Sequence, residues 1–330
     1  MRKSIYLLNS GELRRENNTI CLITDDGKRF LPVEDIGEIH VFGEVDLNKR
    51  LLEFLSEKEI ILHYYNHYDY YMGSFYPREH FNSGYMTVKQ AEHYINPELR
   101  ICLARAFVTG AVKNIRQVLM YYRNRGKEVG SAFERIEKLM GEIDSASSVD
   151  ELMAYEGNIR DAYYGTFDLI IDNPDFVFEV RSKRPPKNRL NALISFGNTL
   201  LYTTTLSEIY RTHLDPRIGY LHTSNFRRFS LNLDVAEIFK PILVDRLIFY
   251  LTGKQMLKKS HFEKKLDGVV LSRSGRTLFI QNFEQRMMST IKHRELGRQV
   301  SYRRLIRMEL YKLEKHLMGE ADYQPFVARW

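Results

Sequence analysis

The first 76 residues alternate apolar and polar positions over short segments. Turn-forming residues, among them Gly11, Gly27 and Gly43, separate segments rich in β-branched and aromatic side chains, an arrangement typical of β-strands. Leucines three to four positions apart within 46–58 predict one helix among them. The pattern indicates a small β-sandwich. We predict its strands at 4–9, 19–24, 28–33, 36–42, 60–66 and 70–76.

From about residue 88 the apolar positions recur every three or four residues, the period of an amphipathic helix. Ser148 and Glu151 form a capping-box pattern that starts one such helix. Pro241 restricts the residue before it, so a helix in that region should kink or begin again there. The main helices are predicted over 98–124, 149–171 and 190–213, with another at the C-terminal end.

These two patterns predict an α+β fold with two domains. We expect an N-terminal β-sandwich domain over 1–80, a linker at 81–90 and a mainly α-helical domain over 91–330. Within the helical part, the run 267–280 resembles a lone β-hairpin. A chain of 330 residues is long enough for two domains of ordinary size.

Composition places the chain among ordinary globular proteins, with 44% hydrophobic and 28% charged residues. The N-terminus has no signal-peptide pattern, and no apolar run approaches the length of a membrane span, so we expect a cytoplasmic protein without membrane contact. Cys21 and Cys102 both lie in apolar contexts. They predict buried thiols in a reducing compartment, not a disulfide framework or a zinc site.

Charge is distributed unevenly along the chain. Residues 1–80 hold 10 Lys/Arg and 14 Asp/Glu, whereas residues 254–330 hold 17 and 8. Solvated helix faces explain an excess of Lys and Arg about as well as a ligand does. The asymmetry favours a surface for a polyanion toward the C-terminal end.

One histidine is followed by two carboxylates at helical spacing. His222 lies in the segment Gly219-Tyr220-Leu221-His222-Thr223, and Asp234 and Glu237 share a helix face one turn apart. Oxygen ligands with one imidazole suit Mg2+ or Mn2+. The alternative makes Asp234 an N-cap and Glu237 its capping-box partner. A carboxylate-held metal in a basic protein points to phosphodiester chemistry on nucleic acid.

Glu156 belongs to the inward stripe of the helix predicted over 149–171, one turn from both Leu152 and Ile159. A lone buried carboxylate is costly unless it is paired or bound to a metal. The alternative is a glutamate at the edge of the stripe that reaches solvent or pairs with an arginine. The helix alone favours that alternative.

Several basic residues are candidates for contacts with DNA phosphates. Five of the nine residues at 181–189 are basic, and Arg303, Arg304 and Arg307 are expected on one surface arc of the C-terminal helix. A solvated linker and a solvated helix face are the alternatives. The chain has no GxxxxGK[ST] loop, no GxGxxG after a strand and no CxxC, so nothing supports ATP, dinucleotide or zinc binding. The candidate DNA-binding residues are Arg184, Lys187, Arg227, Arg228, Arg246, Arg303 and Arg307.

Taken in series, short motifs spread over the helical part resemble one family. This is the family of CRISPR-associated endonuclease/integrase one, the enzymes that insert new spacers into CRISPR arrays. Each motif is weak alone, but their order and spacing are specific. The motifs are Glu156-Gly157, Ala162-Tyr163-Tyr164, Arg184-Pro185-Pro186, Leu190 to Gly197, Leu214-Asp215-Pro216, Gly219 to Thr223, Ser230 to Glu237, Lys240-Pro241, Val244-Asp245-Arg246 and Tyr323-x-Pro325-Phe326.

The resemblance implies that Glu156, His222 and Glu237 are the ligands of a Mg2+ or Mn2+ ion. Asp234 matches the family's additional acidic position beside the metal, which makes it a fourth catalytic residue. The chain departs from the family in small ways. Glu237 stands where some members have Asp, and Ser224-Asn225-Phe226 occupies the region where some members place a lysine. The residue that stabilises the reacting phosphate is therefore left open.

The resemblance also implies an activity and partners. A 3′-hydroxyl of a protospacer would attack a phosphodiester at the CRISPR repeat, and the same site would cleave double-stranded and branched DNA. The family forms homodimers through its β-sandwich, which also docks CRISPR-associated protein two, a small ferredoxin-like partner. Two alternatives are kept: a generic metal-dependent nuclease of DNA repair, and a non-catalytic DNA-binding subunit whose carboxylates are caps and ion-pair partners.

Overall fold

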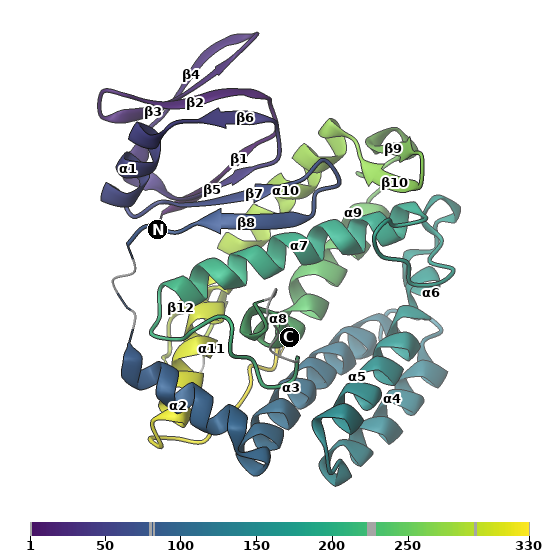
Figure 1. Ribbon diagram of the computed structural model, residues 1–330. Helices are drawn as coiled ribbons and strands as arrows, with labels where there is room; N and C mark the ends of the chain where they lie inside the picture. Colours follow the sequence, from purple (N-terminus) through teal and green to yellow (C-terminus); the bar gives the residue numbers. More distant parts are fainter. Residues whose placement is uncertain (1, 79–80, 82, 223–228, 294–295, 330) are drawn as a thin grey trace. The chain divides into compact units, whose positions relative to one another are not determined.

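The computed structural model describes residues 2–78, 81, 83–222, 229–293 and 296–329 (Figure 1). The chain divides into two compact units, residues 1–80 and 81–330. In the part of the chain that is described, no helix combines the length and the apolar character needed to cross a membrane.

The N-terminal unit contains two four-stranded sheets. In the first, ordered β1-β5-β7-β8, the first three strands are parallel and β8 is antiparallel. The second is ordered β4-β3-β2-β6. The strands are β1 (Lys3–Leu7), β2 (Gly11–Glu16), β3 (Thr19–Thr24), β4 (Gly27–Leu31), β5 (Ile36–Val41), β6 (Val45–Leu47), β7 (Ile61–Tyr65) and β8 (Tyr71–Phe75), with helix α1 at Lys49–Glu57.

The core of this unit lies between the two sheets, which stack face to face with α1 beside them (Figure 1). Leu13 and Ile20 enter it from one sheet, Ile39 and Leu62 from the other, and Phe54 from α1. Because side chains alternate between the faces of a strand, the polar neighbours of Ile39 and Leu62 lie on the opposite face of their sheet. The predicted β-sandwich is therefore present.

Two strands of the sandwich escaped the sequence pattern. The inner strand β2 carries Leu13 as its one buried residue, and charged side chains occupy most of its other positions, so it lacks an apolar run. The helix predicted over 46–58 starts late because Asn48 is its N-cap, with Oδ1 accepting the Leu51 N–H at 3.0 Å. Asp46 belongs instead to the short strand β6.

The second unit is mainly helical. A π-helix, Pro241–Asp245, joins α8 to α9. The helical conformation therefore changes at Pro241 but does not end there. Two short hairpins are formed by β9 (Phe262–Lys265) with β10 (Gly268–Leu271), and by β11 (Thr290–Lys292) with β12 (Gln299–Ser301). The α-helices are α2 (Gly84–Ile95), α3 (Pro97–Arg123), α4 (Gly130–Glu142), α5 (Val149–Tyr164), α6 (Phe167–Ile171), α7 (Arg189–Tyr210), α8 (Leu231–Lys240), α9 (Arg246–Gly253), α10 (Arg273–Met288) and α11 (Tyr302–Leu317).

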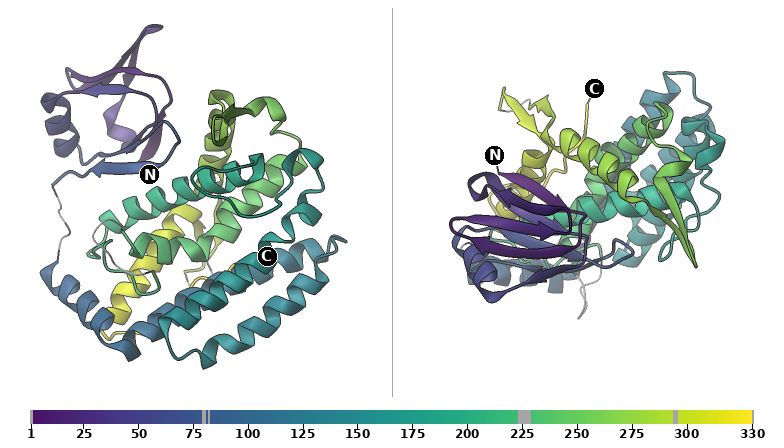
Figure 2. Two further views of the ribbon diagram at one scale, coloured as in Figure 1. Left: turned by 45° about the vertical axis from the view of Figure 1, so that its right-hand side comes forward. Right: turned by 90° about the horizontal axis from the view of Figure 1, so that it is seen from above.

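Helix α7 forms the centre of this unit. It is buried along most of its length and on all sides, as expected for a helix without a polar face. It packs against α8, the π-helix and α11, while α3 packs against α8. Helices α3, α4 and α5 lie side by side in Figure 1 and in the left-hand view of Figure 2. This packing brings α5 and α8 toward one another through their common neighbour α3.

Four expectations from the sequence are wrong. The single helix expected over 149–171 is interrupted at Gly165 and Thr166. Residues 273–280 are helical, because the Ser272 hydroxyl caps α10 by accepting the Gly275 N–H, and the hairpin lies earlier at 262–271. Most of the expected linker 81–90 belongs to α2. Cys102 is exposed, although Cys21 is buried.

Candidate metal and DNA site

An arginine joins two of the predicted metal ligands across two helices. On α5, Arg160 Nε donates to Glu156 Oε1 at 2.6 Å, one helical turn away. Its Nη2 donates to Glu237 Oε2 on α8. Both carboxylates are largely buried, so each needs positive charge nearby. The guanidinium therefore pairs with both acids at once.

Lys240 supplies a second positive charge. Its Nζ donates to Glu237 Oε1 from the next turn of α8, and it lies 4.7 Å from the centre of the Tyr202 ring. Burial by itself would raise the pKa of Glu237, but the charges of Arg160 and Lys240 outweigh it and lower that pKa to about 2. Burial by itself would lower the pKa of Lys240, but the charge of Glu237 outweighs it, and the pKa of Lys240 is raised. Glu237 is therefore ionised and held between two cations.

Asp234 has a different task from the other acids. It is fully buried, and its Oδ2 accepts the N–H groups of Tyr220 and Leu221 at 2.6 and 3.0 Å. Its Oδ1 accepts the His222 N–H at 2.9 Å and lies 2.7 Å from His222 Nδ1. The N-cap of α8 is Ser230, so Asp234 is not the cap that the alternative interpretation required. It fixes the turn that carries His222.

Gly219 makes that close approach possible. A Cβ atom at this position would lie 2.7 Å from the Ser230 carbonyl carbon and 2.9 Å from Asp234 Oδ2. The Ser230 hydroxyl also accepts the Gly219 N–H at 2.9 Å and donates to the Arg217 carbonyl at 2.7 Å. Any side chain at 219 would push the turn away from α8, and His222 with it.

His222 presents one nitrogen to the surroundings and one to Asp234. Its side chain is 27% exposed, so a cation or substrate can reach it. With Nδ1 held by the carboxylate, Nε2 is the nitrogen that would bind a metal, as in the carboxylate–histidine–metal arrangement. Burial lowers the pKa of His222, but the hydrogen bond and charge of Asp234 raise it more. Glu156, Glu237 and His222 form a donor set that fits a hard or borderline divalent cation.

The ligand atoms of Glu156, His222 and Glu237 are not grouped as closely as those of a second set of residues. In the described residues, the group of three whose ligand atoms all lie within 4.8 Å of one another is Glu38, His40 and His63, in the N-terminal unit. Sequence reasoning missed this group because its histidines lie on two separate strands. The alternate positions of Glu38 and His40 on one strand were the available signal.

Two further polar residues near the carboxylates were not among the candidate site residues named from the sequence. Lys183 belongs to the basic segment 181–189. Although the residue is exposed overall, partial burial of its ammonium group lowers its pKa, and the charges of Arg181, Lys240 and Arg160 lower it further. Asp245 is fully buried in the π-helix; burial raises its pKa to about 7, against the opposing charges of Arg160 and Lys240. Both side chains therefore interact electrostatically with Arg160, Lys240 and Glu237.

The candidate DNA-binding residues have different surroundings. Arg184 and Lys187 are exposed, and Lys187 Nζ donates to the Asp267 carbonyl at 2.9 Å. Arg246 is partly buried beside the Tyr121 ring. Arg227 and Arg228 lie outside the described residues.

The expected arc of arginines on α11 is only partly on the surface. Arg303 is 5% exposed and pairs with Glu284 at 3.1 Å, so its expected surface position is wrong. Arg307 is partly buried, and its Nε donates to the buried Glu208 at 2.6 Å. Arg304 is exposed. Two of the three charges are therefore used within the fold.

Comparison with known proteins gives consistent matches over the whole chain. The family model of CRISPR associated protein Cas1 matches residues 5–285. The CRISPR-associated endonuclease Cas1 2 of Thermodesulfovibrio yellowstonii is 60% identical, over 100% of both chains. The CRISPR-associated endonuclease Cas1 of Thermotoga maritima is 52% identical, over 96% of this chain and 98% of that protein.

Solved structures agree with these matches. A Cas1 protein from Thermotoga maritima has a TM-score of 0.88 and 49% identity, over 99% of this chain and 100% of the other. A casposase bound to integration product also reaches a TM-score of 0.88, over 98% of this chain and 93% of the other. At 17% identity the casposase shows the likeness of fold alone.

Proposed function

The chain belongs to the Cas1 family of CRISPR-associated proteins, and from this premise we propose that it is a metal-dependent DNA integrase and endonuclease of CRISPR adaptation. One observation carries the proposal. Two carboxylates from separate helices, Glu156 and Glu237, face one guanidinium, beside a histidine that a buried aspartate holds in place. The two relatives named above are themselves called endonucleases.

Glu156, Glu237 and His222 Nε2 would hold the metal ion. A bound Mg2+ or Mn2+ supplies charge neutralisation at a phosphate oxygen and alignment of the attacking hydroxyl. Asp234 contributes by keeping the imidazole in one orientation and its Nδ1 engaged. Asp234 is thus a positioning residue in this proposal.

Arg160 and Lys240 would serve both the empty and the loaded site. In the metal-free protein their donors neutralise Glu156 and Glu237. Donors released from those carboxylates are suited to phosphate oxygens, which accept strong hydrogen bonds from guanidinium and ammonium groups. Lys183 stands exposed near the same charges and is our candidate for contact with the reacting phosphate.

The reaction is a transesterification. The oxygen of a protospacer 3′-hydroxyl forms a bond to phosphorus at the repeat boundary, and the bond from phosphorus to the former 3′-oxygen breaks. The attacking hydroxyl loses its proton to solvent, and the released oxygen gains one as a new 3′-hydroxyl. One phosphodiester replaces another, so no ATP is consumed. With water as the attacking group, the same arrangement cleaves DNA.

We further propose a homodimer that binds double-stranded and branched DNA and joins the small partner Cas2. Complexes containing both Cas1 and Cas2 are among the structures that share this fold. In this assignment the β-sandwich, residues 1–80, serves dimerisation and partner docking, and the helical unit serves DNA. The acidic balance of the first and the basic C-terminal end of the second support that division. A monomer in light scattering at micromolar concentration would contradict the dimer.

A strand-transfer assay tests the activity. A short duplex with free 3′-hydroxyl ends is mixed with a supercoiled plasmid bearing repeats and with Mg2+ or Mn2+, with and without Cas2. Wild-type protein is compared with His222→Ala and Glu237→Gln. We expect joining and cleavage to fall by at least about 10³-fold in both variants, because catalysis at a metal site depends on each ligand. Glu134→Gln, an exposed residue of α4, is the matched control.

Each failure has its own meaning. Joining at the wild-type rate by His222→Ala would refute the ligand assignment. Cleavage without joining, even with Cas2 present, would indicate a generic nuclease acting on branched DNA. Salt-sensitive DNA binding that is indifferent to metal, without either activity, would indicate a non-catalytic DNA-binding subunit.

A further inference from the structure

The N-terminal unit contains a second cluster of metal-binding side chains. Glu38 and His40 lie on β5 and His63 lies on β7, where His40 and His63 are direct register partners. Their neighbours Ile39 and Leu62 point into the sandwich core, so the cluster occupies the opposite face of the sheet. All three side chains are at most 1% exposed.

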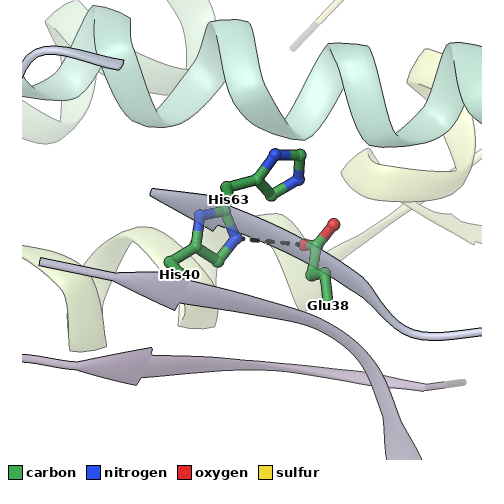
Figure 3. A group of neighbouring side chains, drawn as sticks. All are labelled: Glu38, His40 and His63. Atoms are coloured by element: carbon green, nitrogen blue, oxygen red, sulfur yellow. Dashed lines mark ion pairs between the residues drawn. The ribbon is translucent and has the colours of Figure 1, made fainter. Parts of the chain in front are cut away.

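The three side chains are close enough to share one ion. One ligand atom from each lies within 4.8 Å of the others, and His40 Nε2 is 3.5 Å from Glu38 Oε1 (Figure 3). Two ligands of a tetrahedral zinc ion lie about 3.3 Å apart, given metal–ligand distances of about 2.0–2.1 Å. The Glu38–His40 pair is therefore already near the required separation, and His63 offers a third ligand atom within 4.8 Å of both.

Hydroxyl groups orient both imidazoles. His40 Nδ1 lies 2.7 Å from the Tyr65 hydroxyl, and His63 Nδ1 lies 2.6 Å from the Ser74 hydroxyl. When each Nδ1–H donates to its hydroxyl, Nε2 keeps the lone pair that binds a metal. Glu38 is held in turn by the Ser4 hydroxyl, which donates to its Oε1 at 2.6 Å. The outer contacts that metal-binding histidines require are thus in place.

One atom of the cluster points directly to a missing ligand. His40 Nε2 is buried and makes no hydrogen bond with the described residues. A buried ring nitrogen without a hydrogen bond carries a free-energy cost that a metal–nitrogen bond would remove. The ring itself is fixed, because it stacks on Tyr6 with ring centres 4.5 Å apart.

We infer that Glu38, His40 and His63 bind a divalent transition-metal ion of the zinc type, with a water molecule as the fourth ligand. Two imidazoles and one carboxylate suit Zn2+, Co2+ or Ni2+, whereas Mg2+ and Ca2+ require mostly oxygen ligands. The ion would tie β5 to β7 within the sandwich. None of the three belongs to the donor set proposed for catalysis, so the inference does not depend on the proposed function.

Cobalt tests the site in the full-length chain. Metal-free protein is titrated with Co2+, and the visible absorption is recorded. Four-coordinate Co2+ absorbs visible light far more strongly than six-coordinate Co2+, so this site is distinguished from an oxygen-rich one. We expect an intense band that saturates at one ion per chain and that remains in Glu237→Gln, which removes a carboxylate of the helical unit.

Glu38→Gln is the informative variant, because the amide has the same shape and its oxygen can still accept the Ser4 hydroxyl. We expect it to weaken Co2+ binding at least tenfold. His67→Gln, an exposed histidine in the same unit, should leave the titration unchanged. As a readout that needs no variant of the cluster, Zn2+ should raise the unfolding midpoint of both wild type and Glu237→Gln.

Three results would overturn the inference. The first is the absence of an intense band in the wild type. The second is a band that Glu237→Gln abolishes and Glu38→Gln leaves intact. The third is an unfolding midpoint of Glu237→Gln that Zn2+ does not change. If Glu38→Gln fails to fold, the wild type and Glu237→Gln still decide the matter.

Discussion

Two clusters of carboxylates and imidazoles, one in each unit, differ in the groups that face their acids. In the helical unit Glu237 contacts a guanidinium and an ammonium group. In the β-sandwich Glu38 contacts a hydroxyl and an imidazole. Two cationic side chains therefore neutralise Glu237 in the first cluster.

This difference has consequences for metal binding. An ion entering the helical cluster must compete with Arg160 and Lys240, so its binding is weakened and reversible exchange is favoured. An ion entering the sandwich cluster meets rings already oriented by hydroxyl groups. We expect the first cluster to exchange its ion with solvent and the second to retain it.

Removal of Arg160 should have the largest effect. Arg160→Ala leaves two buried carboxylates without their shared cation, and we expect the metal-free protein to lose roughly 3–5 kcal/mol of unfolding free energy. Urea unfolding measures the loss, and Mn2+ should restore part of it. Arg116→Ala breaks a more exposed pair with Glu137 and should cost roughly 0–1 kcal/mol. Equal losses of unfolding free energy in the two variants would show that Arg160 does not neutralise the two carboxylates in place of the ion.

Weakening of the carboxylate that holds His222 comes next. Asp234→Asn keeps the shape but replaces one acceptor oxygen by an NH2 group, so the turn and the imidazole lose part of their support. We expect Mn2+ affinity to fall roughly 10–100-fold, measured by calorimetry. Asp215→Asn, which loosens another turn through the Arg217 N–H, is the control and should leave affinity unchanged. Unaltered affinity in Asp234→Asn would assign this aspartate to folding alone.

A smaller effect is expected from the exposed lysines. Lys183→Gln should slow strand joining about tenfold, the equivalent of roughly 1.4 kcal/mol, because Lys183 lies near the charges of the helical cluster. Lys187→Gln removes a lysine of the same segment that donates to Asp267 and should change the rate less. Joining rates at saturating DNA make the comparison. The reverse order would move the phosphate contact to Lys187.

The smallest effect concerns a histidine outside both clusters. Burial and the neighbouring His93 lower the pKa of His316, and its Nδ1 accepts the Tyr323 N–H at 3.2 Å. The unfolded chain therefore binds the proton first as the pH falls through about 6.5, so stability is full above that pH and declines below it. Thermal unfolding between pH 7.5 and 5.5 should show a small decline that His316→Gln removes. An identical decline in that variant would assign it to other groups.

The sequence pattern located those helices whose apolar residues recur regularly along one continuous segment. The helix predicted over 98–124 is α3 at Pro97–Arg123, and that over 190–213 is α7 at Arg189–Tyr210. It failed where a cap decided the structure, as Ser272 does for α10. It also failed at β2, whose charged residues hide a strand that pairing on both edges stabilises.

The candidate site was visible only in part for the same reason. His222, Asp234 and Glu237 lie close together in the chain, so their spacing could be examined directly. Arg160 and Glu237 are 77 positions apart, and their contact depends on helix packing that no local pattern contains. The pairing of His40 with His63 depends equally on the register of two parallel strands. The roles assigned to these residues remain predictions.

The buried helix α7 has a consequence for synthesis of the protein. Most of its partners follow it in the chain, namely α8, the π-helix, β10 and α11, and α11 ends 107 residues after Tyr210, at Leu317. At a translation rate of about 5–20 residues per second, roughly 5–20 s pass between the synthesis of α7 and that of the last helix that packs on it. The β-sandwich, whose last strand ends at Phe75, is complete long before. The need for chaperones therefore falls on the nascent helical unit, and slower translation lengthens the interval in which it can aggregate.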